Sequence, residues 1–196
     1  SFINQREVGI DVASFKGALR TVVRQNPDVI LVGEMRDHET FSVALTAAET
    51  GHLVFSTIHA SSVPQTIGRI LDLFPPDQQA GVRKGLVFNL KAIICQKLLP
   101  SITEGVSRVP ATEVMIANAT IQKLLEEERD KDIANLIRAG GEEGMHDFNQ
   151  SLVKLIQGGF ISKKVGLAFS HNAEQLKMNL QGIYLADDKQ ILGTGT

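Results

Sequence analysis

The sequence predicts an α/β fold in which helices flank a parallel sheet, followed by a smaller helical region. Two apolar runs, Val29–Val32 and Leu53–Ile58, have the composition of strands buried inside a parallel sheet. One amphipathic segment, Thr40–Thr50, separates them. Its length suits the right-handed crossover between neighbouring parallel strands. We therefore expect the two runs to lie side by side, with their carboxyl ends at the same edge of the sheet.

Two predicted helices flank these strands. Ser14 is suited to cap the first helix, which ends before Asn26-Pro27-Asp28. The second helix is Thr40–Thr50, and Gly51 follows it as a residue that tolerates positive φ. We expect the two helices to cover the two faces of the sheet. The apolar positions available for this are Phe15, Ala18, Leu19, Val22 and Val23 in the first helix, and Phe41, Ala44, Leu45 and Ala48 in the second.

Cap residues, a proline pair and two apolar runs in the middle of the chain predict two further helices and a hairpin. Ser62 is suited to cap one helix, a proline pair ends it, and Asp77 begins the next. Two apolar runs follow, Ile93–Leu99 and Val109–Ile116. The loop between them is short and polar, so they are expected to pair as antiparallel strands.

Beyond Asn118 the apolar residues recur at helical spacing, which predicts a domain boundary there. Residues 1–117 would form the α/β domain and residues 118–196 a helical subdomain. The tail, Gly193–Thr196, is expected to be disordered. Five short helices are expected in the subdomain, at Ile121–Glu128, Asp132–Arg138, Met145–Gln157, Ser162–Ser170 and Asn172–Gln181.

Composition narrows the classes of function. The 196 residues carry a formal net charge of −2, and the pI is near 6.2, which does not favour a nucleic-acid-binding protein. Cys95 is the single cysteine, so the chain has neither an internal disulfide nor a cysteine-rich zinc site. No apolar run is long enough to span a bilayer, and the first eleven residues do not resemble a signal peptide. We expect a cytoplasmic protein that would meet a membrane through its partners.

An acidic residue follows the first predicted strand. Glu34 comes directly after the apolar run and a glycine, in the sequence DVILVGEMRD. Ligands of doubly wound sheets bind at the carboxyl ends of the strands, where a carboxylate can hold a water of Mg²⁺ or orient an attacking water. The alternative is structural. Glu34 would then cap the next turn, while Arg36 and Asp37 form a solvated pair.

Hydroxyl and imidazole groups flank the second predicted strand, in the sequence TGHLVFSTIHASS. Thr57 and His59 follow its apolar core, at the edge expected for Glu34, where they could contact a phosphate. His52 precedes the strand and would lie at the opposite edge or in the helix–strand turn. The alternative for each histidine is a structural hydrogen bond. A metal shared by the two histidines is disfavoured, because they flank a strand.

Taken together, these two sequences resemble the Walker B and His boxes of the secretion and pilus ATPase superfamily. The resemblance covers about residues 2–170 and is closest to type IV pilus retraction ATPases. Extension and secretion motors usually carry a four-cysteine zinc module. Cys95 is the single cysteine here, which argues against these two classes of motor. Further matching sequences are NQREVG, FPPDQQAGVRKGL, QKLLP, RVPATEVMIAN and GMHDFNQSL.

The resemblance implies a RecA-like P-loop NTPase core and an ATP-driven homo-hexamer that docks on an inner-membrane platform protein. It does not imply a nucleic-acid partner. It implies ATP and Mg²⁺ as cofactors and Glu34 and His59 as catalytic residues. Glu34 would hold Mg²⁺ through water, while His59, His52 and Thr57 would bind the nucleotide. The motor would be cytoplasmic and peripheral at the inner membrane.

Two departures from the family pattern stand out. No Gly-Lys dipeptide occurs, so the P-loop that grips the phosphates is expected upstream of Ser1, together with the acidic Asp box. The retraction signature AIRNLIRE reads DIANLIRA here, with Ala134 and Ala139 in place of an arginine and a glutamate. The sequence therefore leaves two readings open: part of an ATPase motor, or a non-catalytic module or degenerate paralogue within such a ring. In either reading, upstream strands would complete the sheet, so we expect an exposed edge and self-association or partial folding of the isolated chain.

Overall fold

The structure is a computed structural model that describes residues 2–183, so the predicted disordered tail, Gly193–Thr196, lies outside the described residues. The chain forms two compact units. Among the described residues, unit 1 comprises residues 2–59 and 68–90, and unit 2 comprises residues 60–67 and 91–183. This division differs from the boundary predicted near Asn118, which falls inside unit 2. The predicted hairpin groups with the helices that follow it, because its strands contact them.

Unit 1 contains a two-stranded parallel sheet. Strand β1 (Val29–Val32) pairs with β2 (Leu53–Ser56), and Val29 lies opposite Leu53. The prediction of adjacent parallel strands is confirmed. The pairing continues beyond the strand ends, because the backbone N–H of Met35 donates to the carbonyl of Thr57 at 3.1 Å. The residues that follow each strand are thereby brought together.

The helices of unit 1 begin where polar side chains cap them. Helix α1 (Phe15–Val22) starts after Ser14, whose hydroxyl accepts from the backbone N–H of Gly17 as expected. Helix α2 (His38–Glu49) starts two residues earlier than predicted, because the carboxylate of Asp37 caps it through the N–H of Thr40. Helix α4 (Pro76–Asn89) also belongs to unit 1.

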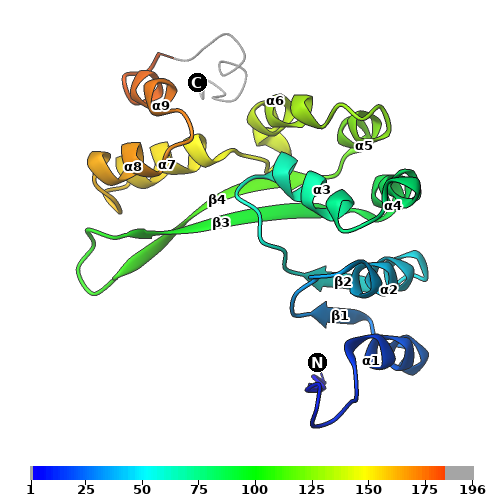
Figure 1. Ribbon diagram of the computed structural model, residues 1–196. Coiled ribbons are helices and arrows are strands. Elements are labelled where there is room, and N and C mark those ends of the chain that lie inside the picture. The colour runs from blue at the N-terminus through cyan, green and yellow to red at the C-terminus, as the bar shows by residue number, and fades with distance from the viewer. Residues whose placement is uncertain (1, 184–196) are drawn as a thin grey trace. The chain divides into compact units, whose positions relative to one another are not determined.

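The two faces of the sheet in unit 1 differ. Helices α1 and α2 both lie on one face, as Figure 1 shows, where Ile30 and Val32 are buried against Leu19, Ala44 and Ala47. The expectation that these helices cover both faces is therefore wrong. Because side chains alternate along a strand, the other face consists of Val29, Leu31, Leu53 and Phe55, all of them exposed.

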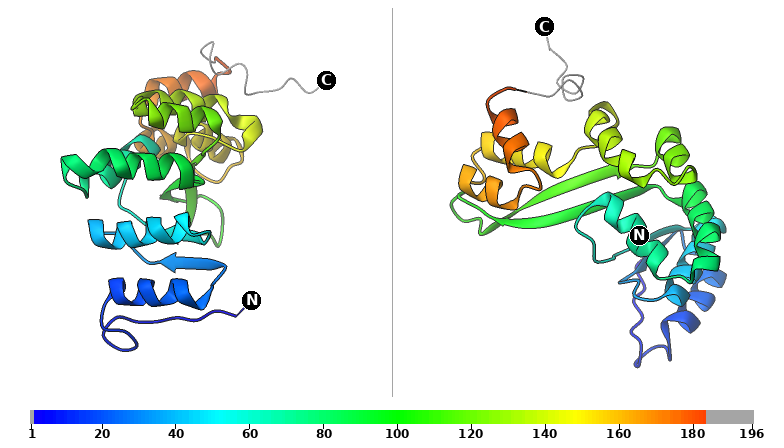
Figure 2. Two further views of the ribbon diagram at one scale, coloured as in Figure 1. Left: turned by 90° about the vertical axis from the view of Figure 1, so that its right-hand side faces the viewer. Right: turned by 45° about the horizontal axis from the view of Figure 1, so that its top comes forward.

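Unit 2 is built on the predicted hairpin. Strand β3 (Ala92–Pro100) pairs with β4 (Arg108–Ile116) in antiparallel register, with Ala92 opposite Ile116. Figures 1 and 2 show the later helices gathered along one side of this hairpin. All five predicted helices are present, with slightly different ends, as α5 (Ala119–Glu126), α6 (Ile133–Ala139), α7 (Phe148–Gln157), α8 (Lys163–Phe169) and α9 (Ala173–Leu180).

Helix α3 (Val63–Asp72) begins in unit 2 and ends in unit 1. Its first residues, through Ile67, belong to unit 2, and its residues from Gly68 onward belong to unit 1. Short 3-10 turns at Val23–Gln25, Asp130–Asp132 and Gly141–Glu143 complete the elements of residues 2–183. Within that same range, no helix combines the length and the apolar character needed to cross a membrane.

Candidate functional site

The carboxylate of Glu34 lies at the carboxyl edge of the parallel sheet and is bound on both sides. Its Oε1 atom lies 3.0 Å from Nε2 of His59, and its Oε2 atom accepts from Nε of Arg36 at 2.6 Å. The sheet produces this meeting, since Glu34 follows β1 and His59 follows the neighbouring strand β2. Arg36 therefore pairs with Glu34 and not with Asp37, which caps α2. The alternative of a solvated Arg36–Asp37 pair is wrong.

The contacts with Arg36 and His59 change the pKa of the Glu34 carboxyl group. The hydrogen bond from Arg36 is the main cause that lowers the pKa of Glu34; desolvation opposes it, and the charges of Arg36 and His59 lower the pKa further. The same bond raises the pKa of Arg36. Glu34 is consequently ionised at neutral pH. An ionised acid held in place can serve as an electrostatic anchor, whereas it has little tendency to take up a proton as a general base.

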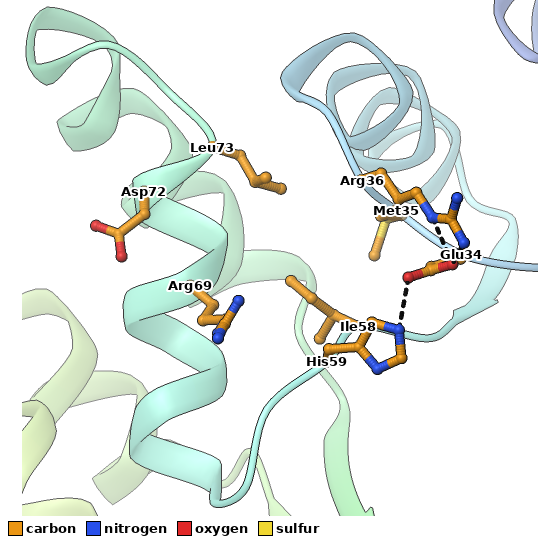
Figure 3. A pocket seen from close by; sticks show the side chains of 8 residues that line it. All are labelled: Glu34, Met35, Arg36, Ile58, His59, Arg69, Asp72 and Leu73. Atoms are coloured by element: carbon orange, nitrogen blue, oxygen red, sulfur yellow. Dashed lines mark hydrogen bonds and ion pairs between the residues drawn. The ribbon is translucent and has the colours of Figure 1, made fainter.

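A pocket of about 410 Å³ opens beside this pair. All its lining residues belong to unit 1. Figure 3 shows Glu34, Arg36 and His59 on one wall and helix α3, with Arg69, on the other. The complete lining is Glu34, Met35, Arg36, Ile58, His59, Arg69, Asp72 and Leu73.

Sequence reasoning missed two charged residues of this pocket, Arg69 and Asp72. They stand three positions apart in α3, so they share one helix face. That spacing was a weak signal, because charged pairs at this spacing are common on solvated helices. Their place in the same pocket as Glu34 depends on where the chain turns after β2, which the local pattern does not reveal.

The two remaining predicted residues are placed differently. The hydroxyl of Thr57 donates to the carbonyl of Gly33 at 2.6 Å, which ties the end of β2 to the end of β1. Thr57 is not among the residues that line the pocket. His52 precedes β2, and its Nδ1 lies 3.0 Å from the carbonyl of Ala47 at the end of α2. The structure thus brings together Glu34 and His59, but not His52, which occupies the opposite end of the strand.

The pocket offers one carboxylate that could hold Mg²⁺ through a water, and two guanidinium groups that could bind phosphate. No group of three or more metal-binding side chains is found among residues 2–183, so direct coordination of a metal by protein side chains alone is not supported. Mg²⁺ is usually held by one or two carboxylates, by waters and by phosphate oxygens. Glu34 fits that role through a water. The guanidinium groups of Arg36 and Arg69 offer donors to phosphate oxygens.

Comparisons with known proteins agree with the resemblance seen in the sequence. A family model described as "Type II/IV secretion system protein" matches residues 3–157. The "Twitching motility protein" of Neisseria gonorrhoeae is 42% identical over 176 residues, which are 90% of this chain and 47% of that protein. The "Type IV pilus retractation ATPase PilT" of Pseudomonas aeruginosa is 45% identical over 162 residues, 83% of this chain and 46% of that protein.

Solved structures confirm the fold class. The crystal structure titled "Pilus Retraction Motor PilT and Bound ADP" matches with a TM-score of 0.79 and 45% identity, over 89% of this chain and 48% of that chain. The ATPase DotB of Legionella pneumophila matches with a TM-score of 0.72 and 28% identity, over 91% of this chain and 45% of that one. The chain spans about half the length of the relatives it matches. It belongs to the type II/IV secretion system protein family, and within that family it is similar to the pilus retraction ATPases.

Proposed function

We propose that this chain is part of an ATP-hydrolysing motor that retracts type IV pili. The pairing of Glu34 with His59 at the carboxyl edge of two parallel strands carries the proposal, because this is where open α/β sheets bind ligands. The relatives named as retraction motors support it. In the proposed motor, six copies form a ring on an inner-membrane platform protein at the cytoplasmic face, and ATP binding and release move its domains.

Within the proposed site, each charged group has a separate task. Glu34 would hold Mg²⁺ through a water, and its hydrogen bond with Arg36 favours the ionised form that this role needs. His59 contacts Glu34 and would sense the γ-phosphate, while Arg69 on α3 would approach the phosphates from the opposite wall. Thr57 maintains the strand ends, and His52 is proposed to act at a subunit interface. Mg²⁺, when bound, would neutralise the charge that develops on the transferred phosphate.

The test replaces Glu34 by glutamine in an intact motor that carries this chain. The amide keeps the shape of the side chain but removes the charge that anchors the metal water. We expect ATP binding to remain and turnover to fall by roughly 10²-fold or more, as when one electrostatic stabiliser is removed. Glu39→Gln is the matched control, since Glu39 is an exposed acid of α2 that pairs with Lys16. Turnover within twofold of the unchanged protein would mean that Glu34 is structural.

A second measurement addresses the competing reading, a module that does not bind nucleotide. The backbone donors and lysine of a P-loop supply most of the grip on the phosphates. The 196 residues contain no Gly-Lys dipeptide and hence no such loop. We therefore expect calorimetric titration of the isolated chain with Mg-ATP to give no saturable heat. Tight binding would show that this chain holds the nucleotide by other means.

A further inference from the structure

Unit 2 contains a pocket of its own, with a volume of about 300 Å³. All its lining residues belong to unit 2, and they come from β4, α6, α7 and the beginnings of α3 and α9. The pocket shares no residue with the candidate nucleotide site of unit 1. Its volume is at the lower end for ligand pockets, which suits a single side chain or a small molecule.

A buried carboxylate forms part of this pocket. Glu113 on β4 is only 7% exposed, and its Oε1 accepts from the backbone N–H of Val63 at 2.6 Å. Among residues 2–183, no donor reaches the other oxygen, Oε2, and no basic side chain forms an ion pair with Glu113. Oε2 is not one of the fully buried unpaired atoms of that range, so it can be reached from the pocket. A buried carboxylate is costly unless donors or opposite charge compensate it, and Oε2 is available to a group that enters the pocket.

The nearest basic residue on the hairpin, Lys97 of β3, is engaged elsewhere. Its Nζ lies 2.7 Å from Nε2 of His171 and 4.5 Å from the centroid of the Phe148 ring. Because an ammonium group only donates, Nε2 of His171 accepts this hydrogen bond. Lys97 therefore binds two residues that line the pocket and leaves the carboxylate of Glu113 without an ionic partner.

The charges around Glu113 favour a positive group beside it. Burial is the main cause that raises the pKa of Glu113, and the hydrogen bond at Oε1 opposes it. The charge of Asp147 raises this pKa by more than the charge of Lys97 lowers it. Arg138 also lines the pocket, but its Nε lies 3.4 Å from Oδ2 of Asp147 and pairs with that acid. No group of three metal-binding side chains exists in the described part of the chain, which favours an organic cation over a metal ion.

The remaining walls suit a long apolar stem that ends in one compact charge. Ile137 and Phe148 are buried apolar residues of the lining, and the stem of a lysine packs on such surfaces while its ammonium stays with a polar partner. A single available oxygen on Glu113 matches an ammonium better than the paired donors of an arginine. Gln175 also lines the pocket, and within the described residues its side-chain amide makes no hydrogen bond. That amide can donate to and accept from a peptide main chain.

We propose that the pocket of unit 2 is a docking site for a lysine side chain of a partner protein, with the ammonium on Oε2 of Glu113. The stem of the lysine lies against Ile137 and Phe148, and its peptide groups meet Gln175. The ammonium supplies the opposite charge that no residue described here brings to Glu113. This site is separate from the nucleotide chemistry and does not depend on the proposed function.

The experiment titrates the 196-residue chain with Nα-acetyl-lysine N-methylamide and follows the backbone amide resonances. We expect a Kd of roughly 1 mM, with shifts centred on Glu113, Phe148 and Gln175. The norleucine analogue has a similar stem without the ammonium and should bind at least roughly tenfold more weakly, as for the loss of one charged hydrogen bond. Pentylamine has the stem and the ammonium without the peptide groups, and it should also bind more weakly.

Three variants test the assignment of residues. Glu113→Gln keeps an oxygen for Val63 but removes the charge, so the lysine compound should bind at least roughly tenfold more weakly. Gln175→Ala lies outside the core and should weaken binding of the lysine compound but not of pentylamine. Glu104→Gln changes an exposed acid in the loop of the same hairpin and should leave both affinities unchanged.

Equal binding of the lysine and norleucine compounds would overturn the proposal, as would an unchanged affinity in Glu113→Gln. Pentylamine that binds as tightly as the lysine compound would assign the pocket to a small free amine and overturn the docking of a partner protein. An unchanged affinity in Gln175→Ala would do the same, and this variant does not alter the buried acid. Because no nucleotide is used, each of these results leaves the proposed function standing.

Discussion

The uncovered face of the sheet in unit 1 gives a prediction about self-association. Val29, Leu31, Leu53 and Phe55 stand on this face and are 51%, 75%, 45% and 53% exposed. Fully burying a side chain of this kind stabilises by about 1.5–3 kcal/mol. Covering what is exposed of all four would therefore contribute about 3–7 kcal/mol on each chain. Two chains that cover each other would gain about twice that, against a cost of association of roughly 4–15 kcal/mol.

These opposing free energies are of similar size, so the isolated chain should associate weakly and in proportion to its concentration. The perturbation is the double variant Leu31→Thr and Phe55→Thr, which removes the two most exposed apolar side chains from the face and keeps residues that suit a strand. We expect sedimentation velocity to show association of the unchanged chain and a monomer for the double variant. The stability of the monomer should change little, because neither side chain is in the core.

Phe88→Thr is the matched control, since Phe88 is 66% exposed but lies on α4. It should associate like the unchanged chain. The reasoning would be refuted if the unchanged chain stayed monomeric at the highest attainable concentration. It would also fail if the double variant associated as strongly as the unchanged chain, because the contact would then lie elsewhere, for example along the edge of a strand.

Three further predictions concern stability. Because burial raises the folded pKa of Glu113 above 4.5, its contribution to stability is fully present below pH 4.5 and is lost as the pH rises through the folded pKa. The melting temperature of Glu113→Gln minus that of the unchanged chain should therefore grow from acid to neutral pH, and a constant difference would contradict this. Leu125→Ala, at a completely buried position of α5, should cost about 2–5 kcal/mol in denaturant unfolding, whereas Leu98→Ala, at an exposed position of β3, should cost far less. Asp147→Ala removes the capping box that Asp147 forms with Gln150 at the start of α7 and should cost about 1–2 kcal/mol, measured in the same way, and a loss below the experimental error would show that the cap is dispensable.

Most elements of the fold could be predicted from local pattern. The apolar runs that became β1 and β2, the cap at Ser14 and the hairpin were all visible in the sequence, because strand composition, cap chemistry and turn residues act over a few positions. The meeting of Glu34 with His59 followed from one topological rule, that parallel strands end at the same edge. The predicted start of α2 lies two residues too late, because the carboxylate of Asp37 caps the helix through the N–H of Thr40.

Only the tertiary structure decided which side chains surround the acid. Arg36 donates a hydrogen bond to Glu34, while Asp37 accepts one from Thr40 and caps α2. Arg69 reached the pocket because the connector after β2 carries α3 to its opposite wall. Both covering helices lie on one face, a choice that the amphipathic pattern of each helix leaves free. The physical reason is common to these cases: periodicity states which side of an element is apolar, but the partner that each side meets depends on contacts between residues far apart in the sequence, such as Glu113 with Val63.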